Sequence, residues 1–147
     1  MNFSRHVTVD WQGTIMEGKG TAKAGSGAFS LPVTFPRRIS EQAEGGVTSP
    51  EELVAAAHAT CYAMVIAATL GRKGASAEQT TVTCTITADK GDSGIKIVTS
   101  KLEVVASGLK GIDAATFEKE MKDAEGKCPV SNALRGSLAI EVDVKIK

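Results

Sequence analysis

One long helical segment constrains the fold of this chain more than any other part of its sequence. Ser49 and Glu52 form an S-x-x-E capping box, and Pro50 suits the first position of the helix. Gly71 is a residue that commonly ends a helix. The residues that keep helical periodicity between these ends are Leu53, Ala56, Ala57, Cys61, Met64 and Leu70. Because the middle of the segment is rich in alanine, another element can approach it closely, which predicts a central packed helix.

The segment before this helix has the pattern of β-structure. Residues 6–11 and 29–35 are strand candidates, and residues 15–16 continue the first pattern after a glycine turn. Glycines at Gly18, Gly20, Gly25 and Gly27 punctuate the chain. Residues 40–48 form a polar loop without periodicity.

The segment after the helix alternates differently. Residues 82–88 and 95–105 read as two strands, and a slip of the apolar phase near Val98 predicts a bulge. Two helices and a closing strand are then expected at residues 113–124, 129–135 and 138–146. The resulting order β-β-β-α-β-β-α-α-β predicts an α+β protein, and the length of 147 residues predicts a single domain over residues 1–147.

Composition excludes several classes of function. Seventeen basic and seventeen acidic residues balance, and one Trp, one Tyr and four Phe are too few for a base-stacking platform, so no nucleic-acid partner is expected. The N-terminus lacks the pattern of a signal peptide, and the apolar stretch at residues 63–70 is far short of a membrane span. Three cysteines without short spacings argue against a disulfide framework. We therefore expect a soluble cytoplasmic protein.

The three cysteines lie in different surroundings. Cys84 is in phase with apolar neighbours on its strand, which predicts a core-facing side chain without a function. Cys61 has His58 three residues earlier, on the same face of the helix. A cationic neighbour is what turns a thiol into a reactive thiolate, so this polar pair on an alanine-lined face indicates chemistry. The competing interpretation is a buried helix cysteine.

Cys128 directly precedes a proline at a predicted helix start, where free backbone N–H groups favour a thiolate. It is as well explained as an ordinary loop cysteine. Two charged groups precede the long helix or lie in its first turn. Arg37 and Arg38 form a pair that most often is simply solvated, and Glu51 is free because its neighbour Glu52 takes the capping role.

Two motifs together resemble a known family. Ser-Pro-Glu-Glu-Leu-Val-Ala-Ala-Ala-His-Ala-Thr-Cys at residues 49–61 and Gly-Lys-Cys-Pro-Val-Ser-Asn-Ala-Leu at residues 126–134 resemble the OsmC/Ohr family of hydroperoxide reductases. Residues 18–21 and 111–117 are similar to the OsmC branch, as are His58 and the Cys-Pro-Val-Ser motif at residues 128–131. The resemblance implies an OsmC-like fold, with antiparallel sheets around a long central helix in an intertwined homodimer.

The resemblance also implies a reaction. Cys61 would attack an organic hydroperoxide as its thiolate, and Cys128 would resolve the resulting sulfenic acid to a disulfide. Arg38, with Arg37 as its competitor, would hold the thiolate and orient the peroxide, and Glu51 would position the arginine. A dithiol donor would reduce the disulfide. In the Ohr branch lipoylated proteins have this role. The implied activity is an antioxidant stress response that needs no metal or other cofactor.

Helix geometry adds a constraint of its own. Ten residues separate Glu51 from Cys61, so the two lie roughly 15 Å apart along a straight helix. Either the helix breaks near residues 54–57, or Arg38 and Glu51 serve Cys61 and Cys128 of a second subunit. The alanine-rich face favours the second option, and we expect active sites shared within a homodimer.

Three alternatives remain open at the level of sequence. The chain could be a small-molecule-binding protein of the same fold with vestigial thiols. His58, Cys61 and Cys128 could bind zinc, since the spacing of the first two suits a helix, although no fourth ligand is evident. His58 could instead act as base for acyl transfer by Cys61, which requires an oxyanion hole that the sequence does not identify.

Overall fold

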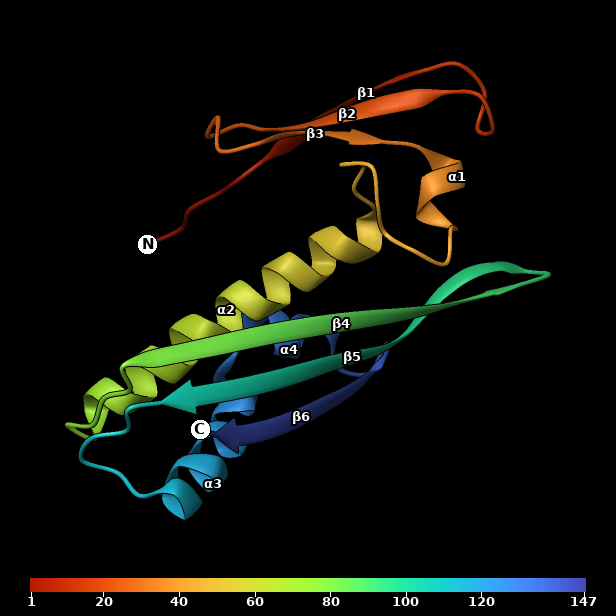
Figure 1. The fold of residues 1–147 in the computed structure, drawn as a ribbon. Helices are drawn as coiled ribbons and strands as arrows, with labels where there is room; N and C mark the ends of the chain where they lie inside the picture. The colour runs from red at the N-terminus through yellow and green to blue at the C-terminus, as the bar shows by residue number, and fades with distance from the viewer. The chain divides into compact units, whose positions relative to one another are not determined.

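The computed structural model describes residues 1–147 and is of the α+β class, as predicted. It divides into two compact units, Met1–Leu53 and Val54–Lys147, each with a three-stranded sheet of its own (Figure 1). The single domain expected from the length stays a prediction. The elements in chain order are β1 (Val7–Gln12), β2 (Lys19–Ala24), β3 (Ser30–Val33), α1 (Phe35–Arg38), α2 (Pro50–Arg72), β4 (Gln79–Gly91), β5 (Gly94–Ser107), α3 (Ala114–Ala124), a 3₁₀ turn (Glu125–Lys127), α4 (Pro129–Leu134) and β6 (Ala139–Ile146).

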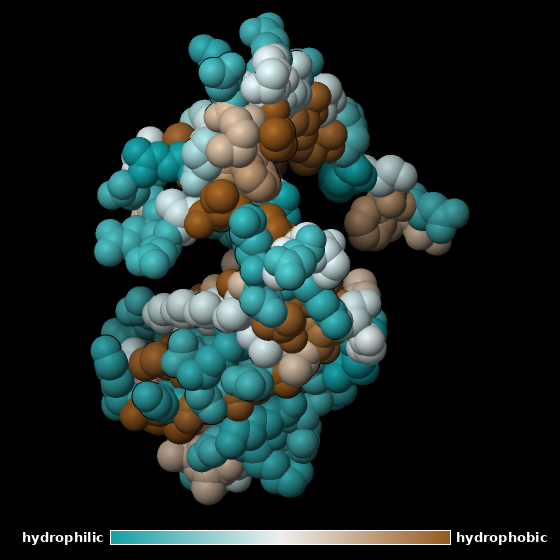
Figure 2. All heavy atoms as spheres, turned by 90° about the vertical axis from the view of Figure 1, so that its right-hand side faces the viewer, coloured by the Kyte–Doolittle hydropathy of each residue, from teal (hydrophilic) through white to brown (hydrophobic).

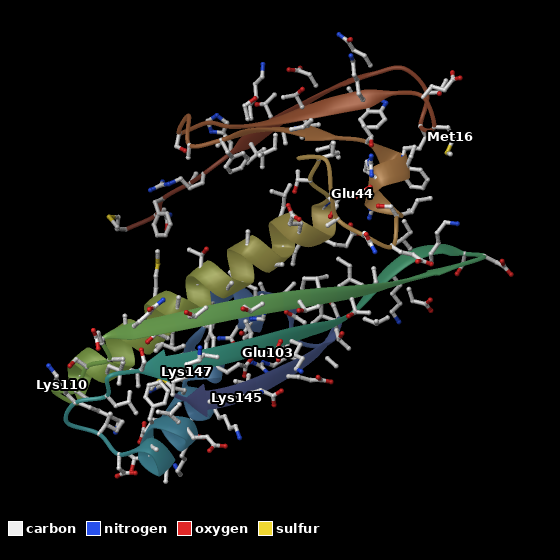
Figure 3. The ribbon with its side chains drawn as sticks, in the orientation of Figure 1. Met16, Glu44, Glu103, Lys110, Lys145 and Lys147 are labelled. Atoms are coloured by element: carbon white, nitrogen blue, oxygen red, sulfur yellow. The ribbon has the colours of Figure 1, made fainter.

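The N-terminal unit is built on the antiparallel sheet β1-β2-β3. The strand predicted at residues 15–16 is wrong, because those residues lie in the turn between β1 and β2, where Met16 is exposed (Figure 3). Of the glycines taken as punctuation, Gly18, Gly25 and Gly27 flank β2 as expected, whereas Gly20 lies within it. Gly20 pairs with Trp11, and a Cβ at Gly20 would come within 2.8 Å of the indole ring. Glycine is therefore required where the backbone of β2 passes under this side chain.

A single helical turn that the sequence did not predict, α1, follows β3. Thr34 caps it, with its hydroxyl accepting from the backbone N–H of Arg37, and Pro36 lies in its first turn. The turn is short, but it sets the directions of the two arginines that end it.

The sheet of the C-terminal unit has the order β4-β5-β6. β4 and β5 form a long antiparallel hairpin, and its register passes from Thr87↔Thr99 to Ala88↔Ile97. Val98 is thus the extra residue of a bulge, which confirms the predicted slip. β6 runs parallel to β5, so the expectation of purely antiparallel sheets is wrong for this pair. The reason is the crossover through α3 and α4, since a helical connection returns the chain in the direction in which it left.

The core of this unit lies between the sheet and its helices, which cover one face of the sheet in Figure 1. Its buried apolar side chains come mainly from α2, β5 and α3; they include Tyr62, Ile66, Leu70, Leu102, Val104, Ala106, Phe117 and Met121. The opposite face of the sheet is polar. Lys101 on β5 forms ion pairs with Glu103 and with Asp143 on β6, and Glu103 and Lys145 project from this sheet in Figure 3.

α2 is one continuous helix from Pro50 to Arg72. The predicted cap is present, since the hydroxyl of Ser49 accepts from the N–H of Glu52 at 3.1 Å. The predicted end at Gly71 is wrong: the helix continues to Arg72. Gly74 follows two residues later, and its φ of +66° is the left-handed conformation that favours glycine. The second half of the predicted capping box is wrong, because the carboxylate of Glu52 accepts from the hydroxyl of Thr48 at 2.9 Å rather than from the N–H of Ser49.

The apolar part of α2 is longer than the stretch at residues 63–70 that was expected to fall short of a membrane span. The helix has 23 residues, and an 18-residue window within it has a mean hydropathy of 1.8, enough by length and composition to cross a membrane. Its buried residues Tyr62, Ile66 and Leu70 pack instead in the core of the C-terminal unit, which makes it a core helix.

We predict that Phe117→Ala lowers the free energy of unfolding by about 3–5 kcal/mol, because it empties a fully buried position where α3 meets the core. Urea denaturation measures this change. Lys119→Ala on the exposed side of the same helix is the control and should stay within about 0.5 kcal/mol of the parent. A loss below about 1 kcal/mol for Phe117→Ala would contradict the packing described here.

Candidate active site

The two cysteines singled out from the sequence come together in the C-terminal unit. Cys61 projects from α2 and is partly buried, whereas Cys128 is 0% exposed and caps the N-terminus of α4. Cys61 packs against the core cluster that contains Cys128, and both are free thiols. The backbone N–H of Ser131 donates to the sulfur of Cys128 at 3.5 Å. The fold therefore joins two thiols that are 67 positions apart in the sequence.

Burial, first of all, raises the pKa of the Cys61 thiol above its ordinary value. The backbone N–H of Val130 acts in the opposite direction, and the neighbouring Cys128 thiol adds to the rise. None of the groups that act on this pKa is cationic. Within this unit, Cys61 is consequently a protonated thiol at neutral pH, and the expected activation by His58 is wrong.

His58 is fully buried and has other partners. Its Nδ1 lies 2.7 Å from the hydroxyl of Ser100 on β5, and its Nε2 lies 2.6 Å from the hydroxyl of Ser131 on α4. Burial lowers its pKa, although the charge of Glu125 opposes this, so the ring is neutral at pH 7. Both ring nitrogens are occupied by serine hydroxyls. This leaves neither nitrogen for binding zinc with Cys61 and Cys128, nor for removing a proton from Cys61.

Cys84 faces the core, as its phase on the strand predicted. It is more than an apolar core residue, because its sulfur lies 3.3 Å from the hydroxyl of Ser100 and 3.9 Å from Nδ1 of His58. Burial raises the pKa of this thiol, which keeps it protonated. Cys84 thus ends a buried polar chain that runs through Ser100 and His58 to Ser131.

Sequence reasoning missed the two serines of this chain. Ser100 carries a signal that could have found it, since it occupies the same phase as Leu102, Val104 and Ala106 on β5. A serine in a core-facing row predicts a buried hydrogen-bond partner. Ser131 carries a weaker signal, its place three residues after Cys128.

The N-terminal unit brings Arg38 and Glu51 together. Nε of Arg38 lies 3.1 and 3.2 Å from the two carboxylate oxygens, and its Nη2 lies 2.7 Å from Oε1. The side chains are 29% and 14% exposed. Arg37, the competing candidate, pairs with Glu44 at 2.6 Å in the loop labelled by Glu44 in Figure 3, and both are more exposed, at 44% and 60%. Of the two arginines, Arg38 is the one that contacts Glu51.

The charge state of this pair suits a fixed cation. Burial raises the pKa of Glu51, but the hydrogen bonds and charge of Arg38 outweigh it and hold that pKa below its usual value. A carboxyl group with a lowered pKa stays ionised at neutral pH. Glu51 therefore loses its negative charge, and with it the ion pair with Arg38, only as the pH falls through the lowered pKa. The contacts with Glu51 use Nε and Nη2 of Arg38, so the N–H groups of Nη1 are available to an anion or a substrate oxygen.

The sequence matches the family described as OsmC-like protein over residues 43–143. It is 35% identical over 146 residues to peroxiredoxin OsmC of Escherichia coli (strain K12), covering 99% of each chain. It is 31% identical over 125 residues to organic hydroperoxide resistance protein-like 2 of Staphylococcus saprophyticus, covering 80% of this chain and 85% of the relative.

Solved structures agree in fold. An organic hydroperoxide resistance protein OsmC from Legionella pneumophila superposes with a TM-score of 0.73 at 25% identity, over 95% of this chain and 96% of that one. An organic hydroperoxide resistance protein from Elizabethkingia anophelis superposes with a TM-score of 0.77 at 20% identity over the full length of both. The match over more than half of the chain and the full-length identity to a relative of the expected branch establish that this protein belongs to the OsmC-like family.

Proposed function

We propose that this protein is a cysteine-based peroxidase that reduces organic hydroperoxides to alcohols in defence against oxidative stress. The observation that carries the proposal is the contact of the Cys61 and Cys128 thiols in a chain of the OsmC-like family. Identity with a peroxiredoxin over the whole chain supports the same activity. A pair of neighbouring free thiols is what a two-cysteine peroxidase needs, one to attack and one to resolve.

The reaction has two steps. The Cys61 thiol releases its proton, and the thiolate attacks the distal oxygen of the hydroperoxide. The O–O bond breaks, the alkoxide takes up a proton and leaves as the alcohol, and Cys61 becomes a sulfenic acid. Cys128 then attacks the sulfur of Cys61, the S–O bond breaks, water leaves with the proton of the thiol, and a disulfide forms. A dithiol donor, for which a lipoylated protein is our proposal, returns both thiols by exchange.

Arg38 supplies what the C-terminal unit lacks. Because burial raises the pKa of Cys61 and no cation opposes it there, the attacking thiolate needs a positive charge from elsewhere. Arg38 is held by two contacts to the Glu51 carboxylate and has donors to spare. In the proposed site Arg38 stabilises the thiolate and the peroxide oxygen, and Glu51 orients Arg38.

The site is shared between two copies of the chain. α2 is unbroken from Pro50 to Arg72, so the helix break that would have been the alternative is absent. The ten residues between Glu51 and Cys61 then span roughly 15 Å. We propose that Arg38 and Glu51 of one subunit complete the site formed by Cys61 and Cys128 of the other.

Exposed apolar surface supports a homodimer. On β1, Val7, Val9 and Trp11 are 51%, 57% and 40% exposed, and brown, apolar side chains reach the surface of the N-terminal unit in Figure 2. On α2, Met64 is 67% exposed and lies among exposed alanines. Exposed apolar side chains gathered on one element, as on β1 and on α2, are typical of a protein interface. We further propose a soluble, cytoplasmic protein of one domain that acts without a cofactor.

We predict that one equivalent of cumene hydroperoxide removes two hydrogens from the intact mass of the reduced protein, through the Cys61–Cys128 disulfide. Cys128→Ser should stop at a sulfenic acid that dimedone traps, and Cys61→Ser should consume no peroxide. Cys84→Ala is the matched control and should behave as the parent. An unchanged mass of the parent would instead favour a binding protein with vestigial thiols.

We predict that Arg38→Ala raises the apparent pKa of Cys61, because the positive charge that stabilises the thiolate is removed. At pH 7 the reaction with hydroperoxide should slow by about 100-fold and recover in part at higher pH. The rate of Cys61 alkylation against pH measures the pKa. Arg37→Ala removes an equal charge that pairs with Glu44, and its pH profile should match that of the parent. Equal profiles for all three proteins would contradict the role of Arg38.

We predict that inactive Cys61→Ser and Arg38→Ala homodimers recover activity when their subunits exchange. In a mixed dimer one site carries both changes and the other carries none. Random exchange of a 1:1 mixture should therefore restore about a quarter of the parent activity. If Arg38 served its own chain, every site would keep one defect. No recovery despite exchange confirmed by mass spectrometry would rule out the shared site.

A further inference from the structure

The buried polar chain around His58 has no part in the reaction described so far. His58, Ser100 and Ser131 are each 0% exposed, and they come from α2, β5 and α4. Both nitrogens of the imidazole are engaged, at 2.7 Å to Ser100 and 2.6 Å to Ser131. A neutral ring with one donor and one acceptor needs two partners to be buried, and the two hydroxyls provide them.

The buried polar chain links the helix that carries Cys61 to the backbone next to Cys128. His58 lies three residues, less than one helical turn, before Cys61 on α2. Ser131, which His58 holds through its hydroxyl, also donates its backbone N–H to the sulfur of Cys128. The path from Cys61 to Cys128 thus runs through α2, one imidazole and one serine, and it contains no exposed group.

We propose that His58 is a positioning residue that, through Ser131, holds Cys128 in place to resolve the Cys61 sulfenic acid. The inference rests on the proposed function and concerns its second step alone. That step needs the sulfur of Cys128 to reach the sulfur of Cys61, displace water and form the S–S bond. When it is slow, a second hydroperoxide oxidises the sulfenic acid to a sulfinic acid, leaving an alcohol and an inactive enzyme.

The geometry favours the Ser131 side of the ring for this task. Ser131 belongs to α4, the element that Cys128 caps, whereas Ser100 belongs to the middle of the sheet. The two serines are otherwise matched, because each is completely buried and each hydrogen-bonds the same ring. Removing the hydroxyl of Ser131 leaves Nε2 without a partner, and removing that of Ser100 leaves Nδ1 with the Cys84 sulfur at 3.9 Å. Only the removal of Ser131 releases the link to Cys128.

The experiment compares Ser131→Ala with Ser100→Ala. Each reduced protein is mixed with a range of excess cumene hydroperoxide, and intact mass spectrometry gives the ratio of Cys61 sulfinic acid to Cys61–Cys128 disulfide. We expect Ser131→Ala to raise this ratio by about tenfold, the loss of one well-placed hydrogen bond, and Ser100→Ala to stay within about twofold of the parent. The initial consumption of hydroperoxide, recorded in the same mixtures, reports on Cys61 itself, and the ratios are compared at equal consumption.

Two substitutions of His58 provide an independent comparison. The amide of a glutamine reaches the position of Nε2 and can still hydrogen-bond Ser131, whereas the amide of an asparagine reaches the position of Nδ1 and serves Ser100. We expect His58→Gln to keep the parent ratio and His58→Asn to reproduce Ser131→Ala. Thermal unfolding of each variant separates this effect from a general loss of stability, which both members of each pair share.

A second measurement does not require the peroxidase reaction. Titration of the two thiols against glutathione gives the equilibrium constant for the Cys61–Cys128 disulfide, which falls when the thiols are no longer held together. A tenfold fall for Ser131→Ala corresponds to a reduction potential about 30 mV higher. Ser100→Ala should not move it.

The outcomes separate the two proposals. If the parent forms no disulfide with hydroperoxide, the proposed function fails, whatever glutathione shows. If the parent forms the disulfide but Ser131→Ala and Ser100→Ala give equal ratios and equal equilibrium constants, the buried polar chain has only a structural role and the inference is overturned. A shift confined to Ser131→Ala and His58→Asn supports it.

Discussion

The hydrogen bonds of one buried imidazole hold together the part of the molecule where the chemistry is proposed. His58 joins α2 to β5 through Ser100 and to α4 through Ser131. Buried polar groups are costly when unpaired and rigid when every partner is present, and here each of the three side chains is satisfied. α4 is only six residues long and has little stability of its own. Its position, and with it that of Cys128, therefore depends on contacts such as this one.

Much of the fold could be predicted because it is encoded locally. The cap at Ser49 and the bulge at Val98 follow from a few adjacent residues, and both are present. The errors occur where a distant partner decides. Gly20 looks like a turn residue until Trp11 from the neighbouring strand is placed over it. Gly71 was a plausible helix end by composition, yet the helix continues to Arg72 and the left-handed position falls at Gly74.

The same division applies to the candidate site. The sequence left Arg37 and Arg38 in competition, and only the geometry of α1 directs Arg38 toward Glu51. The expectation that His58 acts on Cys61 is wrong for a related reason. Residues three apart share a helix face only broadly, and the partners available across the core decide which way each side chain bonds. The serines that bond His58 are 42 and 73 residues away in the sequence, beyond any local pattern.

The pKa of Cys61 explains why the site would need both units of the fold. The C-terminal unit contains both thiols, but burial there raises the pKa of Cys61 and favours its protonated form. The N-terminal unit contains the ordered cation, Arg38 on Glu51, but no thiol. Neither unit is expected to react alone, because a buried neutral thiol attacks peroxide poorly and an arginine is not a nucleophile. In the proposed site, reactivity would arise where the charge of Arg38 meets the sulfur of Cys61. In a homodimer with shared sites, assembly itself would therefore activate the nucleophile, and an unassembled chain would keep its thiols protected.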